Sequence, residues 1–409
     1  MHKACYDMVL RLFPMGGLDM ADASVTPTGF GTDLSVRIRR VEMIPLHIPF
    51  HTPFQIATDR GSTRDFLEVL IIRLHTDQGV VGIGETQAWR RQGSAELLAN
   101  LMYSIKTQFE PLLIGRSPFE LNAIMHDLNA TLYNSLYAQA AIGDALYDLV
   151  GKFLNVPVHA LLGGKCRDRV RVGAVLSMKP TVEEILDSAR GFYDRGFRHL
   201  GLKIGIDPRA DLRNAEALRE AFGDDIVLRV DANASLNYDA ATTLLRKLEP
   251  FDIDAAEQPV AIWDTDGLAA LAKAVAMPIM ADESVSTDHS LLDIIKKRAA
   301  TVVQTKTAKN GGIHYIKRLW NLAEAAGMRI YPGNHPSTSV ATSAVAQMCA
   351  ASPTPVMEGV FAVGVSGALA DDIVENPIRP IHGEVPVPEG PGLGVTLDED
   401  KLVKYRAEL

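Results

Sequence analysis

The chain has 409 residues, of which 47% are hydrophobic and 22% charged, proportions that are typical of folded globular proteins and argue against a disordered or fibrous chain. The formal net charge is −9, from 41 basic and 50 acidic residues, and without a long basic run this argues against nucleic acid or an anionic membrane as the main partner. Three cysteines are too few for a disulfide framework and no apolar run reaches the roughly 20 residues of a membrane helix, so we expect a cytoplasmic protein with about two structural units.

The N-terminal part of the chain begins with an irregular segment and continues with strands. Residues 1–35 show no sustained periodicity and contain several glycines, so we expect a loosely ordered extension there. Two stretches rich in Val, Ile and Leu, 36–48 and 66–74, have the composition of strands. A turn over 75–79 ends in glycine and leads into a third strand at 80–85. Together these stretches predict a small antiparallel sheet.

Helical spacing follows the strands. Within residues 94–155, apolar side chains recur three and four positions apart, as in Leu97, Leu98, Leu101 and Ile105. Strands and helices in separate stretches are typical of an α+β domain, which we place at residues 36–160.

From residue 161 onward, short β-branched runs alternate with amphipathic helices. The strand candidates are 171–176, 199–204, 226–230, 255–257, 278–281, 301–305, 328–331 and 355–357. Eight strands with helices between them over about 200 residues predict a parallel (β/α) barrel over 161–372. The proline-rich tail, 373–409, is expected to be mostly loop, with a short helix over 399–409.

Charged residues recur at the ends of the barrel strands, at intervals of about 24 to 28 residues. They are Lys203, Asp231, Glu257, Asp282 and Lys306, which end the second to the sixth strand. The carboxyl ends of parallel barrel strands converge on one mouth, where barrel enzymes keep their active sites. A single acid would be an ordinary strand-end residue, but three acids in successive units predict a shared site with the two lysines.

The three acids would repel one another unless a cation neutralised them. Asp231, Glu257 and Asp282 offer the hard oxygen ligands that Mg2+ prefers, so they are the candidate metal ligands. Lys203 and Lys306 flank the acids in chain order and are the candidate acid and base catalysts, provided that burial or nearby cations lower the pKa of the base. The alternative for either lysine is a structural salt bridge to the neighbouring carboxylates. Lys309 competes with Lys306 for its role, but because it follows the strand end we expect it to face solvent or to cap the turn.

The ordered set of barrel motifs resembles the enolase superfamily, and within it the muconate lactonizing enzyme subgroup. The motifs are LKIG at 202–205, VDAN at 230–233, EQP at 257–259, ADES at 281–284 and TAKNGG at 307–312. The resemblance covers about residues 36–400 and implies a modified (β/α)7β barrel under an α+β capping domain, to which the tail 373–409 returns. It also implies Mg2+ on the three acids, and Lys203 and Lys306 as acid and base on opposite faces of a small carboxylate substrate.

The chain departs from the pattern of the subgroup at two positions. Gly201 stands where the subgroup has the first lysine of a Lys-x-Lys motif, which removes one cation that would lower the pKa of the base. After the eighth strand, dipeptide epimerases of the subgroup carry Asp-x-Asp, whereas this chain has Glu358 in Met-Glu-Gly-Val. Glu358 is a candidate partner for a cationic or nitrogen-containing substrate, or else a loop-capping acid, and a dipeptide substrate is disfavoured.

Two more residues are candidates near the ends of strands. His335 follows the seventh strand, where the mandelate racemase subgroup of the same superfamily has its catalytic histidine. That subgroup pairs the histidine with an aspartate of the sixth strand, and Lys306 stands at the matching position here, so His335 is a candidate substrate contact rather than the base. Asn233, two residues after Asp231, is expected to support that ligand by a hydrogen bond.

The segment that joins the first two strands is a candidate cover for the barrel mouth. Within residues 51–64, Arg60 and Arg64 would bind an anionic substrate group, although a solvated position is the ordinary one for a loop arginine. We expect substrate specificity to depend on this segment.

Together with these residues, the resemblance implies Mg2+-dependent transfer of the proton α to a substrate carboxylate through an enediolate, in a cycloisomerase or a racemase/epimerase of a small carboxylic or amino acid. The alternative is a dehydratase of a β-hydroxy carboxylate, such as a hydroxylated cyclic amino acid, because it needs the same groups. A barrel hydrolase or aldolase would usually need histidine ligands or a Schiff-base lysine, and the sequence has no His-x-His or His-Glu-x-x-His spacing. A non-catalytic scaffold would instead predict weak metal binding and no loss of function when Lys203 is changed. A homo-oligomer is compatible with the sequence, which carries no signature of an interface.

Overall fold

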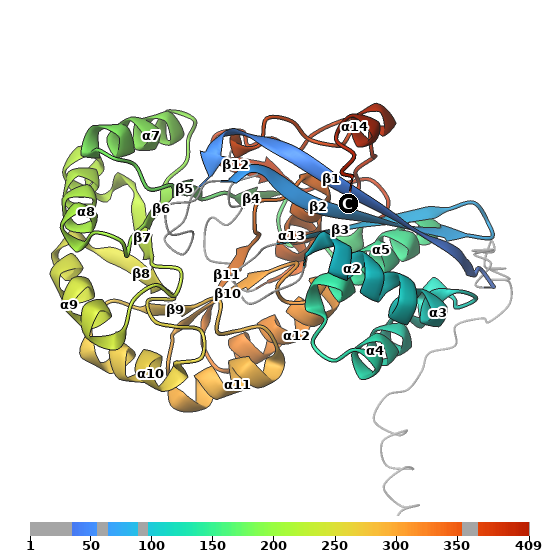
Figure 1. The fold of residues 1–409 in the computed structure, drawn as a ribbon, viewed down its shortest axis with the longest axis horizontal. Helices are drawn as coiled ribbons and strands as arrows, with labels where there is room; N and C mark the ends of the chain where they lie inside the picture. Colours follow the sequence, from blue (N-terminus) through green and yellow to red (C-terminus); the bar gives the residue numbers. More distant parts are fainter. Residues whose placement is uncertain (1–34, 55–63, 89–96, 354–366, 409) are drawn as a thin grey trace, which may run out of the picture. The chain divides into compact units, whose positions relative to one another are not determined.

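The computed structural model describes residues 35–54, 64–88, 97–353 and 367–408 (Figure 1). Several predicted features lie outside these ranges. They are residues 1–34 of the predicted N-terminal extension, the eighth strand candidate at 355–357, Arg60 and Glu358. No helix of the described ranges is both long and apolar enough to cross a membrane.

Three antiparallel strands form the sheet of the cap. In the order β1-β2-β3 they are β1 (Ile38–Phe54), β2 (Arg64–Thr76) and β3 (Val81–Gln87). Ile44 lies opposite Ile71, which in turn lies opposite Glu85. The three strands predicted from the Val, Ile and Leu runs are confirmed, with ends displaced by a few residues.

Helices complete the cap. They are α2 (Leu98–Ser104), η2 (Ile105–Phe109), α3 (Glu110–Leu113), η3 (Pro118–Glu120), α4 (Leu121–Thr131), α5 (Leu136–Leu154) and α6 (Val158–Leu161). The long helix α5 is buried on most of its surface and packs against β3. Its alanine and glycine residues have small side chains, so β3 can approach the helix backbone closely.

A curled sheet of seven parallel strands carries the barrel, in the spatial order β11-β10-β9-β8-β7-β6-β5. The strands are β5 (Ala174–Leu176), β6 (His199–Lys203), β7 (Val227–Asp231), β8 (Ile253–Glu257), β9 (Ile279–Ala281), β10 (Val302–Lys306) and β11 (Arg329–Gly333). Helices α7 (Val182–Asp194), α8 (Pro208–Phe222), α9 (Tyr238–Leu248), α10 (Thr265–Ala274), α11 (Asp288–Lys297), α12 (Gly312–Ala325) and α13 (Ser339–Ala351) alternate with them, and the short turns η4 (Gly223–Asp225) and η5 (Glu249–Phe251) follow α8 and α9. Helices α7 to α12 lie along the outer side of the curled sheet (Figure 1). The predicted fold class, a modified (β/α)7β barrel with an α+β capping domain, is confirmed.

The first barrel strand differs from its prediction. The single strand expected at 171–176 is two strands, of which β4 (Arg169–Arg171) pairs antiparallel with β12 (Glu384–Pro386) and only β5 joins the barrel. The tail therefore contains a strand where only loop was expected before its last helix. Pairing with a segment some 200 residues away leaves no trace in local periodicity, which is why the sequence did not indicate it.

The tail also lies against the cap. The backbone N–H of His47 donates to the carbonyl of Tyr405 at 2.9 Å, and Ala407 N–H donates to Pro45 O at 2.9 Å. The predicted terminal helix is α14 (Glu399–Lys404), which ends five residues before the end of the chain. These contacts hold the last residues of the chain to β1.

A buried carboxylate joins the cap to the barrel. Glu85 of β3 accepts hydrogen bonds from the backbone N–H groups of Thr338 and Ala341, each at 3.0 Å, and from the Thr338 hydroxyl at 2.5 Å. Thr338 is the N-cap of α13, so the carboxylate lies at the positive end of that helix. Burial raises the pKa of Glu85 although these hydrogen bonds act to lower it. The contact fixes β3 next to the loop that follows β11.

Candidate active site at the mouth of the barrel

The carboxyl ends of five adjacent strands bring the charged residues together. In the registers of the sheet, Lys203 of β6 is opposite Asp231 of β7, and Asp231 is opposite Glu257 of β8. Asp282 directly follows β9, and Lys306 ends β10. All five side chains are buried, with relative exposures of at most 8%. The strand-end positions predicted for them are those found.

Lys203 is held by two neighbours on β7 and the loop after it. Its Nζ donates to Asp231 Oδ2 at 2.5 Å and to Asn233 Oδ1 at 2.8 Å. Asn233 also donates from its backbone N–H to Asp231 Oδ1 at 2.8 Å, which fixes the second oxygen of that carboxylate. Asn233 therefore contacts both the candidate base and the candidate ligand.

Lys306 lies at the other side of the acids. Its Nζ pairs with Asp282 Oδ2 and lies 4.0 Å from Glu257 Oε1. Because β7, β8 and β9 separate β6 from β10 in the sheet, the two lysines flank the three carboxylates as chain order predicted.

Lys309 is a correction to the sequence analysis, because this lysine had been expected to face solvent or cap a turn. Only 2% of it is exposed. Its Nζ lies 2.9 Å from Asp282 Oδ1 and donates to the backbone carbonyls of Asp282, Val285 and Gln304. Lys309 is therefore a buried lysine that forms an ion pair with the carboxylate of Asp282.

Arg229 is a residue of the site that sequence reasoning missed. Its guanidinium forms an ion pair with Glu257 and donates to the Tyr331 hydroxyl at 3.1 Å. Arg229 precedes Asp231 by two positions on the same strand, so both side chains point to the same face. This alternation was the signal that would have found it.

The loop after β9 contributes a further buried acid. Glu283 accepts a hydrogen bond from Asn233 Nδ2 at 3.3 Å, and burial followed by the charge of Asp282 raises the pKa of Glu283 to about 8. Gln258 shapes this loop, since its Oε1 accepts from the backbone N–H groups of Asp282 and Ser284, both at 3.1 Å. Gln258 has a φ of 34°, so its backbone is strained next to the site.

The surroundings shift the pKa values of the two lysines in opposite directions. Burial lowers the pKa of Lys203, and the charges of Lys306 and Arg229 add to this effect against the attraction of Asp231. Burial also acts to lower the pKa of Lys306, but the carboxylates of Asp282, Glu283 and Asp231 outweigh it and raise that pKa. The two pKa values differ in direction because Lys306 lies among more carboxylates than Lys203 does.

The donor set fits a hard divalent cation. Asp231, Glu257 and Asp282 present carboxylate oxygens from three neighbouring strand ends, which is the ligand chemistry of Mg2+. Each of these acids is paired with a lysine or an arginine, and within the described ranges no three His, Cys, Asp or Glu side chains gather closely enough to hold an ion as they stand. A cation would therefore compete with Lys203 for Asp231 and with Lys306 for Asp282. Arg229 instead pairs with Oε2 of Glu257 and leaves Oε1 of that carboxylate to a cation.

Of the other predicted residues, His335 lies at this mouth and Arg64 lies within electrostatic reach of it. His335 is buried, and its ring stacks on that of Tyr137 from α5 at a centroid distance of 6.0 Å. Burial, and then the positive charge of Lys306, hold the pKa of His335 well below its ordinary value, and the charge of Arg64 contributes. Arg64 begins β2, so the cap places this cation within electrostatic reach of the barrel mouth.

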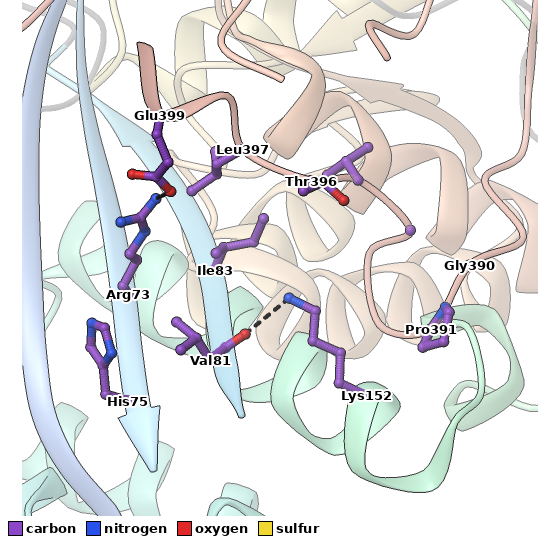
Figure 2. Close-up of a pocket in the computed structure, with 12 residues that line it drawn as sticks. Arg73, His75, Val81, Ile83, Lys152, Gly390, Pro391, Thr396, Leu397 and Glu399 are labelled. Carbon is purple, nitrogen blue, oxygen red and sulfur yellow. Dashed lines mark hydrogen bonds and ion pairs between the residues drawn. The ribbon is translucent and has the colours of Figure 1, made fainter. Parts of the chain in front are cut away.

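A cavity of about 530 Å³ lies away from these residues, between the cap sheet and the tail (Figure 2). Arg73 of β2 and Lys152 of α5 point into it, and both are engaged, Arg73 with Glu399 and Lys152 with the carbonyl of Val81 at 2.9 Å (Figure 2). None of the five charged residues of the barrel mouth lines this cavity. Its volume alone therefore does not make it the candidate active site.

Comparison with known proteins covers nearly the whole described chain. Residues 38–163 match the family model of the mandelate racemase/muconate lactonizing enzyme N-terminal domain, and residues 184–401 match the enolase C-terminal domain-like model. An N-succinyl-L-Arg/Lys racemase of Bacillus cereus is 32% identical over 90% of this chain and 97% of its own length. Muconate cycloisomerase 1 of Rhodococcus opacus is 32% identical over 91% of this chain and 98% of its own length. The crystal structure of muconate lactonizing enzyme from Pseudomonas fluorescens complexed with muconolactone has a TM-score of 0.86 at 30% identity, covering 91% of this chain and all of that one.

Proposed function

The chain belongs to the mandelate racemase/muconate lactonizing enzyme family of the enolase superfamily, and on this premise we propose that it moves the proton α to the carboxylate of a small substrate through an enediolate, with Mg2+ held by Asp231, Glu257 and Asp282. Membership makes it an isomerase or a lyase of this superfamily. The observation that carries the proposal is the pair of buried lysines, Lys203 and Lys306, on either side of three carboxylates at the barrel mouth.

Mg2+, when bound, would act as a Lewis acid toward the substrate carboxylate and stabilise the negative charge of the enediolate. Lys203 would take or return the proton, since Asp231 and Asn233 hold its Nζ in place and its pKa is lowered. Lys306, with a raised pKa, would donate a proton or stabilise charge on the opposite face. The burial of both lysines excludes water that would otherwise compete for the proton.

The relatives support two outcomes for this chemistry. A cycloisomerase forms the enediolate by addition and then protonates it, whereas a racemase removes a proton from one face and returns it to the other. We propose one of these two reactions, on a small carboxylic or amino acid. Glu358, outside the described ranges, stays a predicted contact for a substrate nitrogen, and Arg60 a predicted contact for an anionic group.

A dehydratase of a β-hydroxy carboxylate is the second candidate, since one buried lysine on each side of the three carboxylates also supplies the base and the acid, with fixed roles, that dehydration needs. Racemisation instead needs both groups to exchange roles.

Solvent deuterium exchange tests the proposal. The enzyme is incubated with Mg2+ in D2O with muconate, N-succinyl amino acids, dipeptides and hydroxyprolines, and mass gain and new species are followed by NMR. We expect exchange or turnover of one class, lost in Lys203→Ala and after EDTA treatment. The matched control is Lys317→Ala, which removes an exposed lysine of α12 and should leave exchange unchanged. Exchange that persists in Lys203→Ala would remove that lysine from the mechanism.

A further inference from the structure

Gly201 is an unusual choice for its place in the fold. It lies in the interior of the buried strand β6, directly opposite Arg229 of β7. Glycine weakens a strand interior because it has no side chain to pack and more backbone entropy to lose. The φ of Gly201 is outside the left-handed region, so its backbone conformation does not require glycine. The reason for the glycine must come from its surroundings.

The guanidinium of Arg229 occupies the space that a side chain at position 201 would fill. A Cβ on Gly201 would lie 2.9 Å from Arg229 Cζ, 2.9 Å from Nη2 and 3.1 Å from Nε. No ordinary Cβ contact is this short, so any other residue at 201 would displace the guanidinium. Because the guanidinium is the end of a flexible side chain, such a change would move Arg229 rather than break the strand.

The position of the guanidinium is defined by its partners. Arg229 is ion-paired with Glu257, donates to the Tyr331 hydroxyl at 3.1 Å, and has its Cζ 5.0 Å from the centre of the Tyr331 ring. Tyr331 packs with Ala255, Met280 and Val302 in a small apolar cluster formed by the barrel strands β8 to β11. Arg229 thus bridges that cluster and the carboxylate of Glu257.

We propose that Gly201 and Arg229 form a functional pair, in which the glycine leaves the room that Arg229 needs to position Glu257. Arg229 is then a positioning residue, which holds the carboxylate of Glu257 from the side of the barrel interior. The inference rests on the proposed function, since Glu257 is there a metal ligand. The same arrangement keeps a cation beside Lys203 even though position 201 carries no lysine.

A double-mutant cycle tests the pair. The variants are Gly201→Ala, Arg229→Met and their combination, and the readouts are Mg2+ affinity by titration calorimetry and the midpoint of thermal unfolding without metal. Arg229→Lys serves as the conservative variant, because it keeps the charge but not the planar fork. Gly191→Ala is the matched control, since a Cβ on this exposed glycine of α7 would meet no atom within 4 Å.

We expect Gly201→Ala to weaken Mg2+ binding about tenfold, in the range found when groups that orient metal ligands are removed. Arg229→Met should weaken it at least as much, Arg229→Lys less, and Gly191→Ala not at all. The double variant should be no worse than Arg229→Met, because both changes remove the same contact with Glu257. Wild-type affinity in Gly201→Ala, or a loss in the double variant equal to the sum of the two single losses, would overturn the pairing.

The two readouts separate this inference from the proposed function. If the wild-type protein binds no Mg2+, the proposed function fails. The midpoints of thermal unfolding without metal still test whether Gly201 and Arg229 act as a pair. Non-additive midpoints for positions 201 and 229 would then support the shared space, and additive midpoints would overturn it.

Discussion

Asp144 of α5 is a buried acid whose ionisation opposes folding. Its Oδ1 accepts a hydrogen bond from the backbone N–H of Ile313 at 2.8 Å, and only 1% of the residue is exposed. Burial, and then the nearby charge of Glu85, raise the pKa of Asp144 to about 7 from an ordinary value of 3.8. Between about pH 4 and pH 7 the folded chain therefore binds a proton that the unfolded chain does not, so this residue's contribution to stability falls as pH rises through that window.

We expect Asp144→Asn to remove this part of the pH dependence. One pKa unit corresponds to about 1.4 kcal/mol, so between pH 5 and pH 8 the wild-type protein should lose about 3 kcal/mol more of its free energy of unfolding than the variant does. Urea unfolding at both pH values measures the difference. Asp194→Asn, at the exposed end of α7, controls for the loss of one charge. A variant with the pH dependence of the wild-type protein would show that Asp144 ionises freely in the folded state.

The charged residues of the barrel mouth could be placed from sequence because each βα unit repeats at a similar length. That regularity predicts Lys203 and Lys306 on either side of the acids, and the order of the strands in the sheet agrees. It could not place Lys309, because the chain turns back after β10, where Asn310 N–H donates to Lys306 O at 2.9 Å. This turn brings the Lys309 side chain into contact with Asp282. Periodicity predicts where a strand ends and not how the following loop folds.

At the scale of elements, the approach of β3 to α5 depends on Gly84. A Cβ there would lie 2.0 Å from the carbonyl oxygen of Ala141 and 2.9 Å from its carbonyl carbon. Both are backbone atoms of a buried helix, so the clash can be relieved only by moving β3 away from α5. The same strand carries Glu85, which binds the N-terminus of α13, so a shift of β3 would also loosen the cap from the barrel.

We predict that Gly84→Ala lowers the free energy of unfolding by at least about 3 kcal/mol, at the upper end of the cost of overpacking. Urea unfolding measures this loss. Gly191→Ala should instead leave stability unchanged or raise it by up to about 1 kcal/mol, because alanine is the better helix former and has room there. A loss below about 1 kcal/mol for Gly84→Ala would mean that β3 and α5 separate easily.

The order and type of the elements were largely predictable, and the pairings between distant segments were not. Runs of β-branched residues with helices between them predicted the parallel strands β5 to β11, since each strand is a local feature. The pairing of β4 with β12 joins residues 169–171 to residues 384–386, and each strand is only three residues long. So short a strand has no periodicity of its own, and only the folded barrel brings the two together.

At the scale of the whole molecule, cationic side chains of the barrel neutralise the three carboxylates at its mouth. Lys203, Arg229 and Lys306 each pair with one of the three acids, and Lys309 adds a second cation to Asp282. Removing one partner of a buried ion pair costs several kcal/mol, so each of these cations stabilises the folded chain by neutralising a buried carboxylate. On the proposed function, a metal ion would have to compete with the lysines, and its binding would add stability to a chain that is already folded.

We therefore predict that Mg2+ stabilises a protein that remains folded in EDTA. At a free concentration 100 times its dissociation constant, a ligand that binds only the folded state adds about 2.7 kcal/mol. For a chain of this length that corresponds to a rise of about 3 °C in the midpoint of thermal unfolding. Calorimetry of the wild-type protein and of Asp231→Asn, with NaCl at matched ionic strength as the control, measures the effect. An equal rise in Asp231→Asn or in NaCl would show that Mg2+ acts elsewhere or only by screening, and that the three carboxylates serve the lysines alone.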